Sequence, residues 1–207
     1  MGRDTIDAIK RYFVQTNSAG NKYLSTGQRD KTMEHLSCFV PGLLALASTN
    51  EDLMKNQNEN EILTLAEELA EACHKSYLAS KTHLGPDTFS FTGTSSSNLE
   101  GTALSPKSLL RPEFVESCFY LYRITKKDVY REWAWDYALA IETFAKTDSG
   151  FSGLKDVNDV GSFDGTQQTF LIAETFKYMY LIFSDDEVVS LDKFVFNTEA
   201  HPLRVFQ

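Results

Sequence analysis

The chain has 207 residues, of which 42% are hydrophobic, so it can bury one sizeable core and its composition is neither disordered nor collagen-like. Its formal net charge of -9 argues against a nucleic-acid partner, because binding to phosphates requires a basic surface. No apolar run is long enough to cross a bilayer and the first residues lack the apolar core of a secretory signal, so we expect no membrane segment in this chain.

The first elements are expected to be two helices. Ile6, Ile9 and Phe13 recur at helical spacing behind a cap at Asp4, which predicts a helix over residues 4–15. After a loop and a brief extended segment, the run MEHLSCFVPGLLALAS predicts a short, almost wholly apolar helix. Such a helix belongs inside a core.

The middle of the chain predicts one long helix between irregular segments. Residues 50–60 are polar and indicate a surface connection, whereas 59–78 carry apolar side chains at i, i+3 and i+4, which predicts an amphipathic helix. A Gly-Pro pair then ends the helical pattern before a short hairpin strand through Phe89 and Phe91. The segment 93–108 is expected to be a loop.

Three more helices and one strand are expected in the C-terminal half. Pro112 suits the first turn of a helix, and further helices are predicted over 128–144 and 167–183, separated by a Gly-containing loop. The closing segment 193–205 predicts a single short strand that Pro202 ends. Helices without alternating strands predict an all-α assembly of antiparallel helix pairs.

Two predicted helices carry residue types that suit a sugar site. Arg111 and Glu113 begin a helix, where the helix dipole and the guanidinium would keep the carboxylate ionised, as a general base requires. The alternative is ordinary first-turn charge. Phe170 and Glu174 share one helix face, so a ring and a carboxylate could form the wall of a sugar pocket. The alternative is that Glu174 points to solvent.

The tip of the closing strand carries possible ligands for a cation. Thr198, Glu199 and His201 place a hydroxyl, a carboxylate and an imidazole within four residues, and oxygen ligands suit calcium better than zinc. The alternative is a frayed C-terminus. His35 by itself is more often a satisfied structural residue than a ligand, and the four histidines show no spacing that indicates a metal trio.

The three cysteines, Cys38, Cys73 and Cys118, leave at least one thiol unpaired. A disulfide between Cys38 and Cys73 is compatible with the sequence, and so are three buried, inert side chains. The sequence by itself does not decide between them.

Four ordered blocks of the sequence are MEHLSCFVPGLLAL, LRPEFVESCFYLYR, FLIAETFKYMYLIFSDD and LDKFVFNTEAHPL. Together they resemble glycoside hydrolase family 47, the class I α-1,2-mannosidases, and several ordered blocks are a far stronger signal than one motif. The resemblance implies an all-α (α/α)7-barrel toroid with short β-hairpins and a terminal β-strand. Residues 1–207 would form the C-terminal portion of a single catalytic domain, whose N-terminal half lies outside this sequence.

The resemblance assigns roles to individual positions. Glu113 matches the family's general base, and Asp87 takes the place of a second active-site carboxyl group, where the family usually has the longer glutamate. Thr198 matches the threonine whose hydroxyl and carbonyl oxygens hold Ca2+. Cys38 and Cys73 match the family's disulfide pair. The residues expected to line the subsite for the terminal mannose are His35, Arg111, Phe170, Glu174 and Glu199.

The activity implied by the resemblance is Ca2+-dependent, inverting hydrolysis of terminal α-1,2-linked mannose from high-mannose N-glycans. Inversion needs two carboxyl groups about 6.5–9.5 Å apart, and the family's general acid lies outside these residues, so we expect the chain by itself to be inactive. One alternative is a non-catalytic glycan-binding or glycoprotein quality-control homologue. Another is a helical scaffold without a sugar site.

The family's disulfide also implies a compartment. Disulfides persist in oxidising surroundings, which predicts the lumen of the secretory pathway, in the endoplasmic reticulum or the Golgi. A membrane anchor in the full-length protein is compatible with this placement.

Overall fold

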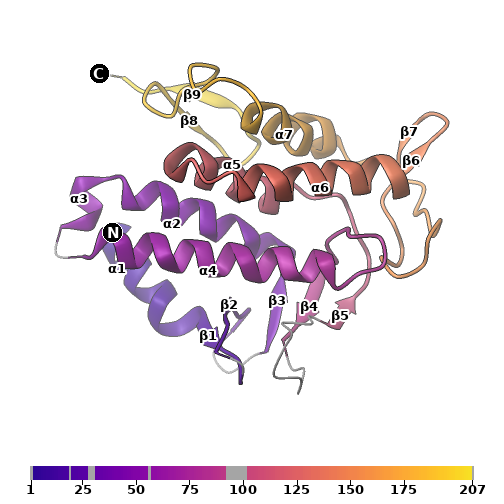
Figure 1. Ribbon diagram of the computed structural model, residues 1–207, viewed down its shortest axis with the longest axis horizontal. Helices are drawn as coiled ribbons and strands as arrows, with labels where there is room; N and C mark the ends of the chain where they lie inside the picture. Colours follow the sequence, from indigo (N-terminus) through magenta and orange to yellow (C-terminus); the bar gives the residue numbers. More distant parts are fainter. Residues whose placement is uncertain (1, 19, 28–30, 56, 92–101, 207) are drawn as a thin grey trace.

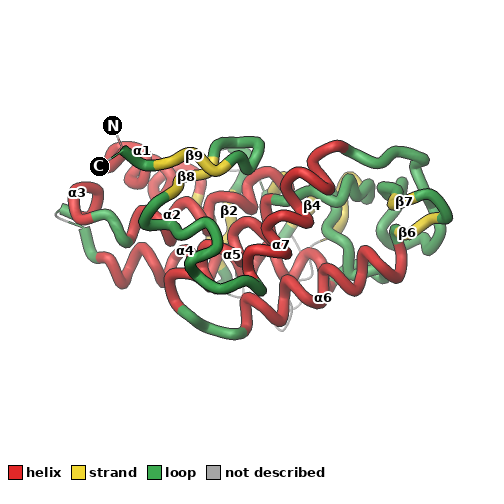
Figure 2. The backbone as a smooth tube through the Cα atoms, turned by 90° about the horizontal axis from the view of Figure 1, so that it is seen from above, coloured by secondary structure: helices red, strands yellow, loops and turns green. Residues whose placement is uncertain are grey.

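The computed structural model describes residues 2–18, 20–27, 31–55, 57–91 and 102–206. The main helices are α2 (Val40–Ser48), α4 (Glu59–Leu78), α5 (Glu113–Thr125), α6 (Val129–Phe144) and α7 (Phe176–Ile182). Helix α2 packs between α4 and α5, and α5 packs in turn against α6 and α7 (Figure 1). Short strands flank these helices in an elongated molecule (Figure 2).

The longest helix, α4, has the bounds that the sequence predicts. The side chain of Asn58 caps it, because its Oδ1 accepts hydrogen bonds from the backbone N–H groups of Asn60 and Glu61. The apolar face is buried, with Ile62 and Leu69 fully excluded from solvent. Helix α4 therefore contributes one side of the core.

Helices α2 and α5 approach each other closely at Gly42. A 3-10 turn, η2 (His35–Phe39), leads into α2, and the N–H of Gly42 donates to Ser117 Oγ at 2.8 Å. A Cβ atom on Gly42 would lie 2.9 Å from a ring carbon of Tyr120 and 3.1 Å from the Cα atom of Ser117. Glycine thus permits the packing of the buried apolar helix that the sequence predicts.

The predicted N-terminal helix ends two residues early. It consists of α1 (Gly2–Ala8) and a π-helical turn, η1 (Ile9–Phe13). Val14 and Gln15 belong instead to β1 (Val14–Thr16), which pairs with β2 (Lys22–Leu24) in antiparallel fashion. Hydrogen bonding to a later strand therefore overrides the helical spacing.

Two segments that were expected to be irregular contain regular structure. The polar connection includes a short helix, α3 (Glu51–Met54). The expected loop includes β5 (Thr102–Ser105), and its residues 92–101 lie outside the described part of the chain. Strand β5 pairs with β4 (Thr88–Ser90), which pairs with β3 (Thr32–Glu34), so the sheet order is β3-β4-β5.

The predicted helices of the C-terminal half are present, with small departures. The Gly-containing loop starts with a hairpin of β6 (Lys146–Thr147) and β7 (Gly150–Phe151), at the opposite end of the molecule from α3 (Figure 1). The last predicted helix begins at Thr169, passes through a π-helical turn, η3 (Leu171–Thr175), and continues as α7.

The closing segment is a hairpin, and the expectation of a single strand ended by Pro202 was wrong. Strand β8 (Phe194–Phe196) pairs with β9 (Pro202–Arg204), with Phe196 opposite Pro202. Proline lacks an N–H donor but is tolerated at the first residue of an edge strand. The turn between these strands carries Thr198 and Glu199.

A disulfide joins Cys38 of η2 to Cys73 of α4, with their Cα atoms 6.0 Å apart. Cys118 is a buried free thiol, and burial raises its pKa. Within the described ranges, no helix combines the length and the apolar character that a bilayer-spanning helix needs.

Candidate active site

Glu113 and His35 form the centre of the candidate site. Glu113 is the first residue of α5, and its Oε2 lies 2.8 Å from Nδ1 of His35, at the start of η2. Burial by itself would raise the pKa of Glu113, but the hydrogen bond and electrostatic attraction from His35, with Arg111, outweigh it and lower the pKa. The carboxylate is therefore held in its ionised form.

His35 is not an isolated side chain. Its other ring nitrogen, Nε2, lies 2.6 Å from the hydroxyl of Tyr77, which is on α4. Its backbone N–H donates to the carbonyl of Asp87 at 2.9 Å. The ring is buried, with the residue only 2% exposed, so both of its nitrogens are satisfied by protein groups.

Arg111, Asp87 and Phe170 form a second part of the site. Nε of Arg111 donates to Oδ1 of Asp87 at 2.8 Å, and the guanidinium carbon lies 5.8 Å from the centroid of the Phe170 ring. Both members of the ion pair remain partly exposed. They can therefore still reach a bound ligand.

The segments that carry these groups are joined through Leu110. Its carbonyl accepts a hydrogen bond from Thr175 Oγ1 at 2.8 Å, which ties the entry of α5 to η3. Leu110 has a φ of 59°, a left-handed backbone conformation that is uncommon for a bulky residue. Such strain is often found at functional sites.

Two further carboxyl groups lie close to Glu113, of which Glu174 is buried and Glu116 is half-buried. Glu174 is only 7% exposed, and within the described residues its carboxylate has no hydrogen-bond or ion-pair partner. Burial, with repulsion from Glu199 and Glu113, raises the pKa of Glu174 to about 7. Burial likewise raises the pKa of Glu116 to about 7, despite the hydrogen bond from Tyr178. The alternative in which Glu174 points to solvent is excluded.

The β8–β9 turn brings the C-terminal residues to the same place. Asn197 Oδ1 accepts hydrogen bonds from the backbone N–H groups of Glu199 and His201 at 3.0 and 2.9 Å. Lys177 of α7 donates to the carbonyl of Ala200 at 2.8 Å. Thr198 and Glu199 are exposed on a turn that is held at both ends, so the turn is not a frayed terminus.

A calcium ion fits the chemistry of this cluster. The described residues contain no set of three or more His, Cys, Asp or Glu side chains arranged to hold a metal. However, Glu174 is a buried carboxyl group that forms no ion pair within the described residues, and repulsion from Glu199 and Glu113 outweighs the attraction of the more distant Lys177. Ca2+ prefers oxygen ligands, which the hydroxyl and carbonyl of Thr198 would provide at its edge.

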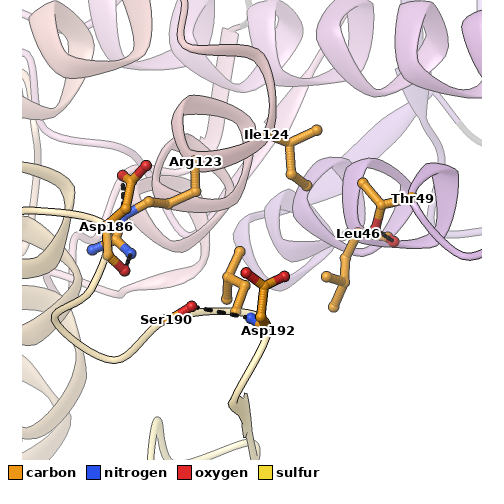
Figure 3. Close-up of a pocket in the computed structure, with 8 residues that line it drawn as sticks. Leu46, Thr49, Arg123, Ile124, Asp186, Ser190 and Asp192 are labelled. Carbon is orange, nitrogen blue, oxygen red and sulfur yellow. Dashed lines mark hydrogen bonds and ion pairs between the residues drawn. The ribbon is translucent and has the colours of Figure 1, made fainter.

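A separate pocket of about 270 Å3 lies away from these residues (Figure 3). It is lined by Leu46, Thr49, Arg123, Ile124, Asp186, Ser190, Leu191 and Asp192. Arg123 is buried, and its guanidinium donates to the carbonyls of Leu181, Asp185, Asp186 and Val188. These bonds join the end of α5 to the end of α7, so Arg123 has a structural role.

The sequence profile described as "Glycosyl hydrolase family 47" matches residues 2–205. The chain belongs to this family. Curated members of family 47 that it resembles include "Mannosyl-oligosaccharide 1,2-alpha-mannosidase mans-2" of Caenorhabditis elegans, with 44% identity over 98% of the chain and 34% of the relative. Another is "Mannosyl-oligosaccharide 1,2-alpha-mannosidase IC" of Homo sapiens, with 42% identity over 98% of the chain and 32% of the relative. The chain spans about a third of the length of these relatives.

A solved family 47 structure confirms the fold class. The alpha-1,2-mannosidase from Trichoderma reesei superimposes with a TM-score of 0.84 and 26% sequence identity, over 99% of this chain and 47% of that chain. That structure is an (α/α)7 barrel, so the expectation of an all-α toroid with short hairpins, present here in part, was correct.

Sequence reasoning missed Tyr77 as part of the site. It appeared only as one apolar position on the predicted face of α4. A signal was available in its position four residues after Cys73, because residues one helical turn apart share a face. The expected Cys38–Cys73 disulfide would then have placed it near His35.

Proposed function

We propose that the chain is the C-terminal portion of the catalytic domain of a Ca2+-dependent α-1,2-mannosidase. Its reaction would be the hydrolysis of terminal α-1,2-linked mannose from high-mannose N-glycans, with inversion at the anomeric carbon. The observation that carries the proposal is the pairing of Glu113 with His35 at the mouth of α5, next to Arg111 and the buried Glu174. The names of the relatives support the substrate class.

Glu113 is proposed to be the general base. One of its oxygens is bound by His35, which leaves the other free to accept a proton from the attacking water. Its lowered pKa keeps the carboxylate ionised over the neutral range. The general acid would come from a part of the domain outside these 207 residues, on the other side of the glycosidic bond.

Arg111, Phe170, Glu174 and Glu199 are proposed to receive the terminal mannose. His35 was also expected to line this subsite, but its ring is buried and both of its nitrogens are bonded to protein groups, so we propose that it supports Glu113 instead. The ring of Phe170 offers an apolar surface, while the carboxylates of Glu174 and Glu199 can accept hydrogen bonds from sugar hydroxyls. Asp87 would act as the second catalytic carboxyl group of this chain, and its bond to Arg111 orients the guanidinium.

Thr198 is proposed to bind Ca2+ through its hydroxyl and carbonyl oxygens. When bound, the ion would coordinate mannose hydroxyls and stabilise negative charge nearby. The hydrogen bond from Lys177 to the carbonyl of Ala200 fixes the turn on which Thr198 lies, which supports Thr198 as a ligand on a rigid turn.

The rest of the domain is proposed to cover an apolar face on α6, η3 and α7. Trp135, Ile172 and Tyr180 are 55%, 62% and 66% exposed, and the Trp135 ring contacts Phe183 across the two helices. Large exposed apolar groups in one region indicate an interaction surface. The Cys38–Cys73 disulfide supports a location in the lumen of the endoplasmic reticulum or Golgi.

A chimera tests the proposal. The part of the C. elegans relative that this chain does not match would be joined upstream of the 207 residues and assayed on α-1,2-linked mannobiose and on high-mannose N-glycans. We expect calcium-dependent release of mannose, first as the β-anomer because the reaction inverts. Glu113→Gln should lower kcat by at least about 100-fold.

The control is Glu132→Gln, an exposed carboxylate on α6, which should leave the rate unchanged. Binding of mannose glycans without hydrolysis would instead support the glycan-binding homologue. No binding in any variant would contradict both readings and leave a helical scaffold.

A further inference from the structure

Tyr77 forms a hydrogen-bonded chain with His35 and Glu113. The tyrosine is 3% exposed, its hydroxyl lies 2.6 Å from Nε2 of His35, and Nδ1 of His35 lies 2.8 Å from Oε2 of Glu113. A neutral imidazole has one protonated and one unprotonated nitrogen. The groups that face the two nitrogens therefore decide where the proton is.

The chemistry of the two partners favours one arrangement. An ionised carboxylate can only accept, so a hydrogen bond between His35 and Glu113 requires the proton to be on Nδ1. Nε2 of a neutral ring is then an acceptor and needs a donor, which the Tyr77 hydroxyl provides. Burial, with repulsion from Tyr137 and Glu113 and a hydrogen bond with the Tyr137 side chain, raises the pKa of Tyr77 well above its usual value, so the hydroxyl keeps its proton.

We propose that Tyr77 is a positioning residue for the general base: by donating to Nε2 of His35, it stabilises, together with Glu113, the Nδ1-protonated tautomer that holds the carboxylate. Its catalytic relevance rests on the proposed function of Glu113. The tyrosine does not touch the substrate. It acts through His35, which would otherwise be free to carry its proton on Nε2 and lose the bond to Glu113.

The surrounding structure fixes the Tyr77 ring in this position. A Cβ atom on Gly85 would lie 2.4 Å from the ring, so glycine is needed where the chain passes it. The rings of Phe114 and Tyr137 pack against it, with centroids 4.6 and 5.0 Å away. The hydroxyl of Tyr137 donates to the carbonyl of Arg111 at 3.1 Å, so its proton is not directed at His35.

The disulfide aligns the two partners. Cys38 is three residues after His35, and Cys73 is one helical turn before Tyr77, so the bond joins the same two elements as the His35–Tyr77 hydrogen bond. A tyrosine that only filled the core would not need a hydroxyl directed at a buried imidazole. The hydrogen-bonded chain therefore distinguishes positioning from simple packing.

The test is nitrogen NMR of the 207-residue chain with labelled histidine, recorded over a series of pH values and analysed where the His35 ring carries a single proton. In the wild-type chain we expect His35 to have a protonated Nδ1 and an unprotonated Nε2. In Tyr77→Phe, which keeps the ring but removes the hydroxyl, we expect the Nδ1-protonated population to fall several-fold. The carboxyl carbon of Glu113 should then titrate at a higher pH.

The matched control is Tyr130→Phe, another buried tyrosine, which packs edge-on against Trp133 and not against His35. It should leave the His35 tautomer and the Glu113 titration unchanged. If Tyr77→Phe does not fold, the spectrum of the wild-type chain still tests the proposal. A His35 ring that carries its proton on Nε2 rather than on Nδ1 would overturn it. An unchanged tautomer in a folded Tyr77→Phe chain overturns it as well.

This result is separable from the proposed function. An Nδ1-protonated His35 that depends on Tyr77, in a chimera without mannosidase activity, would support the hydrogen-bonded chain and contradict the hydrolase. Conversely, an active chimera in which the His35 tautomer does not depend on Tyr77 would support the hydrolase and contradict the proposed role of Tyr77. In an active chimera, Tyr77→Phe should also raise the pKa of the acidic limb of the kcat/KM profile, whereas a purely structural role would leave that limb in place.

Discussion

Arg111 and Asp87 are paired through Nε and Oδ1 at 2.8 Å, so the short side chain of the aspartate is long enough to reach the guanidinium. We predict that Asp87→Asn weakens binding of mannose to the chimera by about tenfold, because Arg111 loses its charged partner and its fixed orientation. The free energy of unfolding should change by less than about 1 kcal/mol, because the pair is partly exposed. Calorimetric titration and urea unfolding measure the two effects.

The control for this prediction is Glu142→Gln, which removes the exposed partner of Lys146 on α6. It should change neither binding nor stability measurably. Equal affinity of Asp87→Asn and the wild-type chimera would show that the ion pair does not orient Arg111 for the sugar.

Glu174 should make the chain less stable as the pH rises. Its pKa is raised to about 7 in the folded state, mainly by burial, whereas an unfolded glutamate titrates near its usual value of about 4.3. The folded state therefore binds more protons between these two values, and the free energy of unfolding falls over that window as the pH increases. Below a pH of about 4, Glu174 is protonated in both states and does not change the free energy of unfolding. Above a pH of about 7, the decrease in that free energy has reached its full size.

Glu174→Gln tests this reasoning, because a neutral amide needs no proton. We expect the variant to be more stable than the wild-type chain at pH above about 7, by on the order of 1–2 kcal/mol, in calcium-free buffer. The two should converge at the acidic end. Urea unfolding at a series of pH values measures the difference, and a constant difference across the series would contradict the prediction.

Thr198 should determine how calcium affects thermal stability. An ion that binds only the folded state, at about 100 times its dissociation constant, adds about 2.7 kcal/mol, which corresponds to a rise in Tm of roughly 5–10 °C for a chain of this size. Thr198→Ala should lose most of this rise relative to chelator. The matched control is Thr143→Ala, an exposed threonine on α6, which should keep the full response.

The outcome that contradicts this prediction is an equal calcium response in Thr198→Ala and the wild-type chain. Such a result would place the ion elsewhere or show that the backbone carbonyl suffices. Thermal melts followed by circular dichroism, with calcium and with chelator, provide the measurement.

The Cys38–Cys73 disulfide should contribute about 3–4 kcal/mol to stability. The two cysteines are 35 residues apart, and closing a loop of that length in the unfolded chain accounts for such a value in the loop-entropy model. Reductant should therefore lower the urea midpoint of the wild-type chain. The double variant Cys38→Ser, Cys73→Ser should already show the lower midpoint and should not respond to reductant; a further shift would implicate another effect of the reagent.

The parts of the fold that were predictable are those that local signals determine. Helix α4 has its own cap at Asn58 and a regular apolar face, so the positions of both its ends could be predicted from the sequence. By contrast, Val14 leaves the first helix because it pairs with Leu24, and β5 forms because it pairs with β4. Such pairings depend on contacts between distant segments, which helical spacing does not encode.

The same distinction applies to the candidate site. The residue types around Glu113 were visible in the sequence, and the family resemblance gave their expected roles. The burial of Glu174 was not predictable, because its position relative to solvent depends on how η3 packs beside α5. The bond between Tyr77 and His35 also joins residues 42 positions apart, so the only sequence signal for it was indirect, through the position of Tyr77 one helical turn after Cys73 and the expected disulfide.

Helix α5 sets the distance between Glu113, the proposed general base, and Arg123, which binds the end of α7. Glu113 is its first residue, and Arg123, ten positions later, binds the backbone that follows α7. Ten helical residues separate these groups by about 15 Å along the axis. Deleting one residue between them would rotate Arg123 by about 100° relative to Glu113. The guanidinium could then no longer face the backbone carbonyls at the end of α7 and in the segment that follows it. The number of residues between Glu113 and Arg123, and not only their identities, therefore determines whether both side chains can make their contacts.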